Sequence, residues 1–484
     1  MLTLGHVLEA LTGYQAGGGA QVITDVAIDS RLVIPGALFV ALPGERTDGH
    51  EYVGAAFAKG AVAALVQRDP FAGQPESGQA FHNLDLREPV THAMAQLADL
   101  HLPVCLVVDN SLQAMQTLAA WWRKRLSVRV VGITGSVGKT TTKELVASVL
   151  DKRYCTFKSE GNLNNEIGLP LMLLKLTEAH ERAVLEMGFY QPGEIKFLCD
   201  LARPQVGVIT NIHPVHLERA GTLENIALGK GELVEALPPA PEGVAILNYD
   251  DAQVLAMRSR TRARVFTYGL DPQADVWADE IESEGLEGIH FQLHHRHERL
   301  HLRVPLLGRH SAHTALRAAA VGLVEGLTWQ EIVEGLRSLG AAQIRLAAVT
   351  GPGGSLILDD TYNASPESVI AALNLLHELE GRHVAVLGDM LELGSFEEAG
   401  HRMVGRRARE VADLLVTVGP RARLIADEAR QSGLPEAAVV ELEDSAAALA
   451  YLQQHIGAGD VVLLKGSRAL HLDRVVADLE TGEV

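Results

Sequence analysis

The segment over residues 128–150 is the part of the sequence that restricts the fold most strongly. It begins with the β-branched run VRVV and continues through the glycine-containing loop TGSVGKT. In the following KELVASVL, the apolar side chains recur at the spacing of one helix face. This order predicts a strand, a loop and a helix.

The loop in this segment has the composition of a phosphate-binding loop. Gly135 and Gly138 let backbone amides approach an anion closely, and the N-terminus of the following helix carries a partial positive charge. Lys139 adds a full charge, and the Thr140 hydroxyl can bind Mg²⁺. Ile133 stands where the strict pattern has glycine, so a surface turn with a solvated lysine is the alternative. The residues expected to bind the nucleotide here are Thr134, Gly135, Ser136, Val137, Gly138, Lys139, Thr140 and Thr141.

Composition restricts the class of protein. The chain of 484 residues is 47% hydrophobic and 21% charged, which is typical of a soluble globular protein with about two to four domains. Its net charge of −19 argues against a broad nucleic-acid or membrane surface, and no apolar run approaches a membrane span. The N-terminal MLTLGHVLEA lacks the basic region of a secretory signal, so we expect a cytoplasmic protein. The three cysteines lie far apart, and we expect buried structural thiols.

The chain divides into three segments over residues 1–109, 110–340 and 341–484. The middle segment alternates strand-like and helical runs, from AVLEMG through IKFLCDLA and VGVITNI to GVAILN. The last segment alternates again, from SLILDD to DVVLLKGS. Such alternation predicts mainly parallel sheets with helices on both faces. We therefore expect an α/β fold of three domains, the second ATPase-like and the third Rossmann-like.

Three other stretches allow predictions about local structure. AAFAKGAVAALV in the first segment has a helical pattern, and a helix is one interpretation of residues 93–100. IHFQLHHRHERLHLRV alternates and predicts hairpin strands. Its histidines could form a metal cluster, but a solvated strand face is favoured because alternate side chains point to opposite faces. These histidines are His290, His294, His295, His297 and His301.

Short motifs along the whole chain match those of a known family. They are DSR at 29–31, DGH at 48–50, TGSVGKTTTK, GNLNNEIGLP at 161–170, EMG at 186–188, TNIHPVHLE, LGKGE at 228–232, GRH at 308–310, DDTYNASPES at 359–368, VLGDMLELG at 386–394 and KGSR at 465–468. Each motif alone is weak evidence. In their number and order they resemble the Mur ligases.

The resemblance implies an ATP-dependent amide ligase of peptidoglycan precursor synthesis. Such a ligase moves the γ-phosphoryl group of ATP onto a carboxylate, and an amine then attacks the acyl phosphate. Cations must bring these anions together. DDTYNASP and VLGDMLELG are similar to the branch of the family that adds D-Ala-D-Ala to UDP-MurNAc-tripeptide. The resemblance thus implies a UDP-substrate domain at the N-terminus, ATP and two Mg²⁺ ions. We expect a monomer, although the sequence itself does not give the oligomeric state.

The resemblance also assigns roles to residues outside the loop. Glu186 closes the strand AVLEMG, at the sheet edge where ligands of open α/β sheets bind, and is implied to be a Mg²⁺ ligand. His216 is implied to bind a second Mg²⁺, whereas His213 is expected to be structural. Arg345 and Asp360 are implied to contact the nucleotide. The residues implied to contact the substrates are Ser30, Arg31, Asn164, Asn165, Asn363 and Lys465.

Lys230 lies on the apolar stripe of the helix predicted in TLENIALGKGELVEAL. A lysine that faces inward tends to lose its proton, although its stem can instead pack while its ammonium reaches water. The resemblance implies that Lys230 is carbamylated, which gives an anion able to help hold the second Mg²⁺ beside His216. Lys139, His216 and Lys230 are therefore the expected catalytic residues.

The sequence departs from the family pattern at several positions. Ser311 and Thr314 stand where asparagines usually follow GRH, and Arg345 follows Ile344 rather than glycine. The adenine contacts, the reach of Arg345 and the third residue of the tripeptide therefore stay open.

Other functions are weighed against this one. A ligase that adds a single amino acid and a folylpolyglutamate synthetase are close alternatives, although the DNPR tetrapeptide of the diaminopimelate-adding enzyme is absent. A nucleotide-dependent switch protein should carry NKxD, and the nearest candidate, NYDD at 248–251, lacks the lysine.

Overall fold

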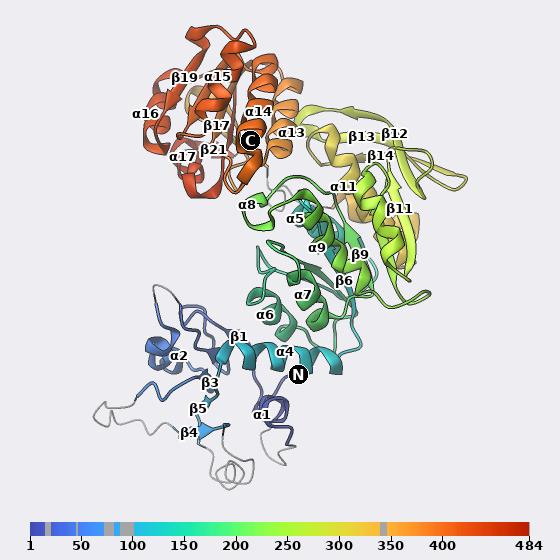
Figure 1. The fold of residues 1–484 in the computed structure, drawn as a ribbon, viewed down its shortest axis with the longest axis vertical. Helices are drawn as coiled ribbons and strands as arrows, with labels where there is room; N and C mark the ends of the chain where they lie inside the picture. The colour runs from blue at the N-terminus through green and yellow to red at the C-terminus, as the bar shows by residue number, and fades with distance from the viewer. Residues whose placement is uncertain (15–20, 45–46, 72–81, 88–100, 339–345, 484) are drawn as a thin grey trace. The chain divides into compact units, whose positions relative to one another are not determined.

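The computed structural model describes residues 1–14, 21–44, 47–71, 82–87, 101–338 and 346–483 (Figure 1). They form two compact units. Unit 1 comprises Met1–Gly132, Tyr154–Gly188 and Glu194–Gln205, and unit 2 comprises Ile133–Arg153, Phe189–Gly193 and Val206–Val484. The boundaries of the three expected segments remain a prediction. Within the described ranges, every helix is too short or too polar to cross a bilayer.

Unit 1 begins with a parallel sheet of five strands in the order β1-β2-β3-β5-β4. The strands are β1 (Val26–Ala27), β2 (Leu38–Val40), β3 (Ala63–Val66), β4 (His82–Asp85) and β5 (Val104–Val107), accompanied by helices α1 (Leu4–Thr12) and α2 (Val53–Ala58). Phe39 and Val53 are among the residues of its apolar core.

The helix expected over AAFAKGAVAALV is wrong in its second half. Helix α2 ends at Ala58, Gly60 turns the chain with a φ of 95°, and the following residues form β3. All four residues of β3 are buried, so the strand has no polar alternation. Strands buried on both faces cannot be distinguished from buried helices by periodicity alone. The interpretation of residues 93–100 as a helix falls outside the described part of the chain.

The rest of unit 1 is built around α4 (Ser111–Arg125), which packs against α6 (Gly168–Leu174) and α7 (Glu194–Ala202). Trp122 on α4 donates a hydrogen bond from Nε1 to the carbonyl of Leu176 at 2.9 Å. Strands β7 (Thr156–Lys158) and β8 (Arg182–Glu186) pair in parallel. Cys105 and Cys199 are buried as expected, whereas that expectation is wrong for the exposed Cys155.

The central part of unit 2 confirms the predicted strand and helix alternation. Strand β6 (Arg129–Thr134) crosses the division between the units and leads into α5 (Lys139–Leu150). The next strands are β9 (Val206–Ile209), β10 (Val244–Asn248), β11 (Arg264–Gly269), β12 (Val276–Ser283), β13 (Ile289–His295) and β14 (Glu298–Val304). Strands β9 to β12 pair in parallel, and β12 to β14 are antiparallel. The helices here are α8 (Leu217–Ala220), α9 (Leu223–Glu235), α10 (Ala252–Ala256), α11 (Ala312–Val324) and α12 (Trp329–Arg337).

The predicted hairpin is confirmed, but its histidines do not all lie on a solvated face. His294 and His295 are buried, and the His294 ring stacks on Trp277 at 3.8 Å between centroids. His294 Nε2 also lies 2.8 Å from a carboxylate oxygen of Asp279. His297 and His301 are exposed, as expected.

The C-terminal part of unit 2 is a sheet with helices on both faces. Its strand order is β19-β18-β17-β20-β16-β15-β21. The strands are β15 (Ala347–Thr350), β16 (Leu356–Asp359), β17 (Arg382–Gly388), β18 (Leu414–Val418), β19 (Val439–Leu442), β20 (Asp460–Lys465) and β21 (Gly482–Glu483). The helices are α13 (Pro366–Glu378), α14 (Glu397–Val411), α15 (Arg423–Gln431), α16 (Ser445–His455) and α17 (Leu472–Leu479).

Successive strand residues in this sheet face opposite cores. Leu463 belongs to the core under α13, α14 and α15, which lie side by side in Figure 1. Leu464 belongs to the core under α16 and α17. Strands β16 to β19 and β20 pair in parallel, so their carboxyl ends share one edge. Asp360 and Lys465 lie at that edge.

Candidate active site

The phosphate loop (residues 134–141) joins β6 to α5, as the sequence predicts. Gly135 has a φ of 145°, and a Cβ there would lie 1.8 Å from Oγ1 of Thr210. Gly138, with a φ of 84°, immediately precedes α5. Both conformations favour glycine. The loop therefore holds backbone amides at the N-terminus of α5, where an anion is favourable.

The residues after β9 fix this loop from the side. Ser136 Oγ donates to the carbonyl of His213 at 3.0 Å and accepts from its amide at 2.9 Å. The amide of Val137 donates to Oδ1 of Asn211 at 2.9 Å. His213 thus supports the loop through its backbone. Lys139 folds over the loop, with Nζ 2.9 Å from the carbonyl oxygen of Gly135.

A cavity of about 760 Å³ opens beside the phosphate loop. Its lining from the central part of unit 2 includes Ser136, Val137, Gly138, Lys139, Thr140, Thr141 and His216. Its C-terminal lining includes Asp360, Asn363, Glu392 and Lys465. Segments more than two hundred positions apart in the sequence thus meet around one cavity. Thr134 and Gly135 are not among the residues that line the cavity.

His216 is held by a carboxylate from the C-terminal part of unit 2. Its Nδ1 lies 2.5 Å from Oε2 of Glu392. Both residues have left-handed backbones, with φ of 58° and 63°. Burial lowers the pKa of His216, while the hydrogen bond with Glu392 opposes that shift. A carboxylate on Nδ1 selects the tautomer that leaves the Nε2 lone pair available.

Lys230 faces inward from α9, as its place on the apolar stripe predicts. Its side chain is 1% exposed, and Nζ donates to the carbonyl of Gly135 at 3.0 Å. The amine also lies 4.7 Å from the centre of the Phe189 ring. Burial, together with the charge of Lys139, lowers the pKa of Lys230 well below its usual value. The interpretation in which its ammonium reaches water is therefore wrong.

A second cationic group lies at the C-terminal wall of the cavity. Lys465 is 2% exposed, and its Nζ lies 2.7 Å from Oδ2 of Asp360 and 2.9 Å from the carbonyl oxygen of Asn363. These three expected site residues thus form one hydrogen-bonded group. The neighbouring Asp359 instead accepts from the amide and hydroxyl of Thr361, at 3.0 Å and 2.6 Å, and stabilises the turn.

Two of the other expected site residues interact within unit 1. Asn164 Nδ2 donates to Oε1 of Glu186 at 2.9 Å, and Glu186 is 1% exposed. The side chain of Asn165 accepts from the amide of Gly168 at 2.9 Å, at the start of α6. Asn165 thus supports a helix terminus.

The two expected residues near the N-terminus of unit 1 lie in a turn after β1. Ser30 is buried, and Arg31 is exposed with Nη2 2.7 Å from Oδ2 of Asp29. The remaining expected site residue, Arg345, falls outside the described residues.

The expected Mg²⁺ ligands are Thr140, Glu186, His216 and Lys230. Around no point in the described part of the chain do three or more His, Cys, Asp or Glu side chains gather as a ready metal site. Thr140 and His216 line the same cavity. The charge of Lys139, which disfavours a Lys230 ammonium, would stabilise an anion in the same place. A carbamylated Lys230 would therefore add an anionic donor to the neutral donors Thr140 and His216.

Sequence reasoning missed Glu392 as a partner of His216. The glutamate lies within the motif VLGDMLELG, which was the available signal, but nothing local relates it to a histidine 176 positions earlier.

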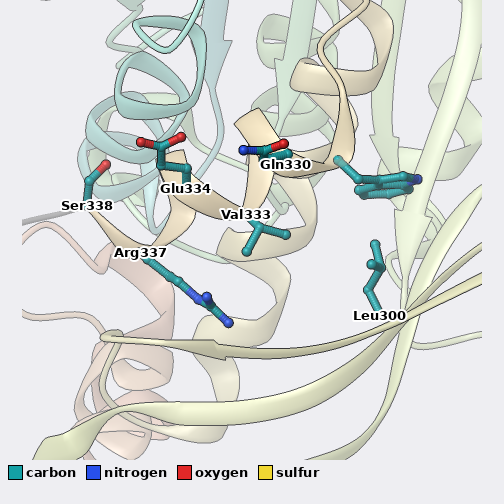
Figure 2. Close-up of a pocket in the computed structure, with 7 residues that line it drawn as sticks. Leu300, Gln330, Val333, Glu334, Arg337 and Ser338 are labelled. Atoms are coloured by element: carbon teal, nitrogen blue, oxygen red, sulfur yellow. The ribbon is translucent and has the colours of Figure 1, made fainter.

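A second hollow, of about 590 Å³, lies between β14 and the exposed side of α12 (Figure 2). Leu300, Val333 and Arg337 are among its lining residues. None of the expected site residues lines it.

Comparison with known proteins gives matches along the whole chain. Three family models match: "Mur ligase family, catalytic domain" at residues 22–101, "Mur ligase middle domain" at 133–322 and "Mur ligase, glutamate ligase domain" at 344–468. UDP-N-acetylmuramoyl-tripeptide–D-alanyl-D-alanine ligase of Escherichia coli K12 is 35% identical over 99% of this chain and 98% of its own. The Bacillus subtilis protein of that name is also 35% identical, over 95% and 93%.

Solved structures resemble the chain over the same extent. MurF from Acinetobacter baumannii has a TM-score of 0.80 at 30% identity and covers 98% of both chains. MurF ligase from Thermotoga maritima in complex with ADP has a TM-score of 0.73 at 27% identity and covers 97% of both.

Proposed function

The chain belongs to the Mur ligase family, and from this premise we propose how its cavity joins D-Ala-D-Ala to UDP-MurNAc-tripeptide with ATP. The protein is an ATP-dependent ligase of peptidoglycan precursor synthesis. One observation carries the assignment of the site. The phosphate loop and the group formed by Asp360, Asn363 and Lys465 line one cavity, so a nucleotide at the loop faces the C-terminal wall.

The reaction has two steps. A carboxylate oxygen of the tripeptide attacks the γ-phosphorus of ATP, the bond to the β-phosphate bridging oxygen breaks, and an acyl phosphate and ADP form. The amine of D-Ala-D-Ala then attacks the carbonyl carbon, loses a proton and displaces phosphate. Both steps bring anions together, so the contribution of the protein is positional and electrostatic. Lys139 and the amides at the start of α5 neutralise the phosphates.

We assign the residues at the other wall to substrates and nucleotide. Asp360 fixes the ammonium of Lys465, whose charge we place near the anionic reactants. Asn363 contributes to the same wall. In unit 1, we assign Ser30 and Arg31 to the UDP-sugar and Asn164 and Asn165 to the tripeptide substrate.

Two Mg²⁺ ions would be bound: His216 and a carbamylated Lys230 are the proposed ligands of the second ion, and Thr140 and Glu186 are each proposed as Mg²⁺ ligands. When bound, these ions would supply positive charge that reduces the repulsion among the anionic reactants. Glu392 orients His216 so that Nε2 is available. Lys230 is poised for carbamylation because a buried amine of lowered pKa is neutral and therefore nucleophilic toward CO₂.

Carbamylation can be tested without relying on activity alone. With ¹³C-bicarbonate, the wild type should show a carbamate carbon signal that Lys230→Ala abolishes. A Lys196→Ala variant, which alters an exposed lysine, should retain it. A small added carboxylate should partly restore ligation to Lys230→Ala. A wild type without any Lys230-dependent signal would show that the lysine is unmodified.

The overall reaction is tested by phosphate release from ATP in the presence of UDP-MurNAc-tripeptide. D-Ala-D-Ala should support turnover, whereas single amino acids and glutamate should not. Turnover with a single amino acid or a folate substrate would favour the sister enzymes. Binding of GTP without ATP turnover would favour a switch protein. Comparison of tripeptides ending in diaminopimelate, lysine or ornithine identifies the third residue. We further propose that the enzyme is cytoplasmic and monomeric, and its molar mass from light scattering tests the monomeric state.

A further inference from the structure

Arg317 is a buried arginine that the reaction described above does not use. It lies in the alanine-rich helix α11, which packs against α5, and its side chain is 4% exposed. It lines the cavity together with the phosphate loop. Its guanidinium lies against that loop, because a Cβ on Gly138 would be 3.3 Å from Nη2.

The hydrogen-bonding capacity of this guanidinium is only partly used. Nη2 donates to Oγ1 of Thr314 at 2.6 Å, but Nε has no acceptor among the described residues. Within that part of the chain, no carboxylate lies within 4.0 Å of the guanidinium. The nearby acidic residues are engaged elsewhere: Asp250 with His313 Nε2 at 2.7 Å, and Asp251 with the amide of Ile212 at 2.8 Å.

A buried cation with an unused donor is costly unless an anion compensates it. The neighbours of Arg317 indicate where an anion could bind and compensate its charge. Gly138 directly precedes α5, where backbone amides already favour an anion. A nucleotide bound at the phosphate loop would bring a phosphate group, which is an anion, to the space beside Arg317.

We infer that Arg317 is a further nucleotide ligand, which binds a phosphate group of ATP and ADP opposite the amides of the phosphate loop. Thr314 positions it by accepting from Nη2, in place of the asparagine that usually stands there. The inference rests on ATP being the nucleotide substrate. In this chain, the threonine that replaces the usual asparagine at position 314 thus serves to hold the guanidinium of Arg317 toward the phosphate.

Calorimetric titration of the full chain with ADP and with adenosine tests this inference. Arg317→Met should weaken ADP binding about 10- to 100-fold, because it removes a charge-assisted contact. Adenosine, measured by displacement of ADP, should bind within about threefold of its wild-type affinity, since it carries no phosphate. Arg317→Lys should retain part of the ADP affinity, and Thr314→Val should lose about two- to fivefold. Arg299→Met, on the exposed face of β14, is the matched control.

The outcomes distinguish a contact with phosphate from a contact with the base. Unchanged ADP affinity in Arg317→Met would overturn the inference. An equal loss of affinity for ADP and adenosine would also overturn it, because Arg317 would then contact the base or support the wall of the cavity. If Arg317→Met fails to fold, the Lys and Thr314→Val variants carry the test. A wild type that binds ADP but fails to ligate would contradict the proposed function and leave this measurement intact.

Discussion

Replacement of Glu392 tests how the site holds His216. Glu392 lies 2.5 Å from Nδ1 of His216, and the two residues directly before it in the loop are held by hydrogen bonds. The amide of Met390 donates to Nε2 of His401 at 3.1 Å, and that of Leu391 donates to Oγ of Ser467 at 2.8 Å. Removal of the carboxylate should therefore leave the loop in place and release only the imidazole.

Two substitutions of Glu392 should weaken metal binding by different amounts. Glu392→Ala removes the acceptor, and loss of such an outer partner typically weakens metal binding about 10- to 100-fold. Glu392→Gln keeps an oxygen that can accept from Nδ1 but loses the charge. Because the Glu392 side chain is 36% exposed, we expect a loss of only about 1 kcal/mol, or roughly fivefold.

Two measurements test whether Glu392 orients His216 and supports metal binding. Mn²⁺ binding in the presence of ADP, followed by electron paramagnetic resonance, gives the affinity. Imidazole ¹⁵N spectra report whether His216 carries its proton on Nδ1. Glu398→Gln, on the exposed surface of α14, is the matched control. If Glu392→Ala leaves both the Mn²⁺ affinity and the Nδ1 proton unchanged, Glu392 does not orient His216.

Three further outcomes follow from the structure. Lys139→Ala should lower turnover about 100-fold or more while the melting temperature stays within a few degrees, and near-normal turnover would contradict its assignment. Gly229→Ala should destabilise the protein by about 1–3 kcal/mol in denaturant unfolding, because its Cβ would lie 2.0 Å from the Phe189 ring; an unchanged midpoint would mean that the ring moves freely. His401 is fully buried, and burial lowers its pKa below the ordinary 6.5, so the unfolded chain binds more protons and stability should fall as pH drops below 6.5. The His401→Gln variant should be less stable than the wild type at pH 7, but its stability should fall less as the pH drops. If the stability of the variant falls as much as that of the wild type, His401 is not the source of the pH dependence.

Local patterns were sufficient for the phosphate loop and most of the α/β alternation. The glycines, Lys139 and the flanking apolar periodicity act within one segment, so neighbouring residues alone specify strand, loop and helix. The inward orientation of Lys230 also followed from helix periodicity. The same reasoning failed for AAFAKGAVAALV, since a strand buried on both faces has no period to read.

The folded chain alone brings distant residues together. Lys465 meets Asp360 because β20 and β16 end at the same edge of one sheet, whereas Glu392 meets His216 from a loop that follows a strand of a different sheet. No pattern within one segment records either pairing. The uncompensated charge of Arg317 is likewise visible only in three dimensions. Burial and the absence of a counter-ion depend on which other segments surround a side chain, whereas helix and strand formation depends mainly on its neighbours along the chain.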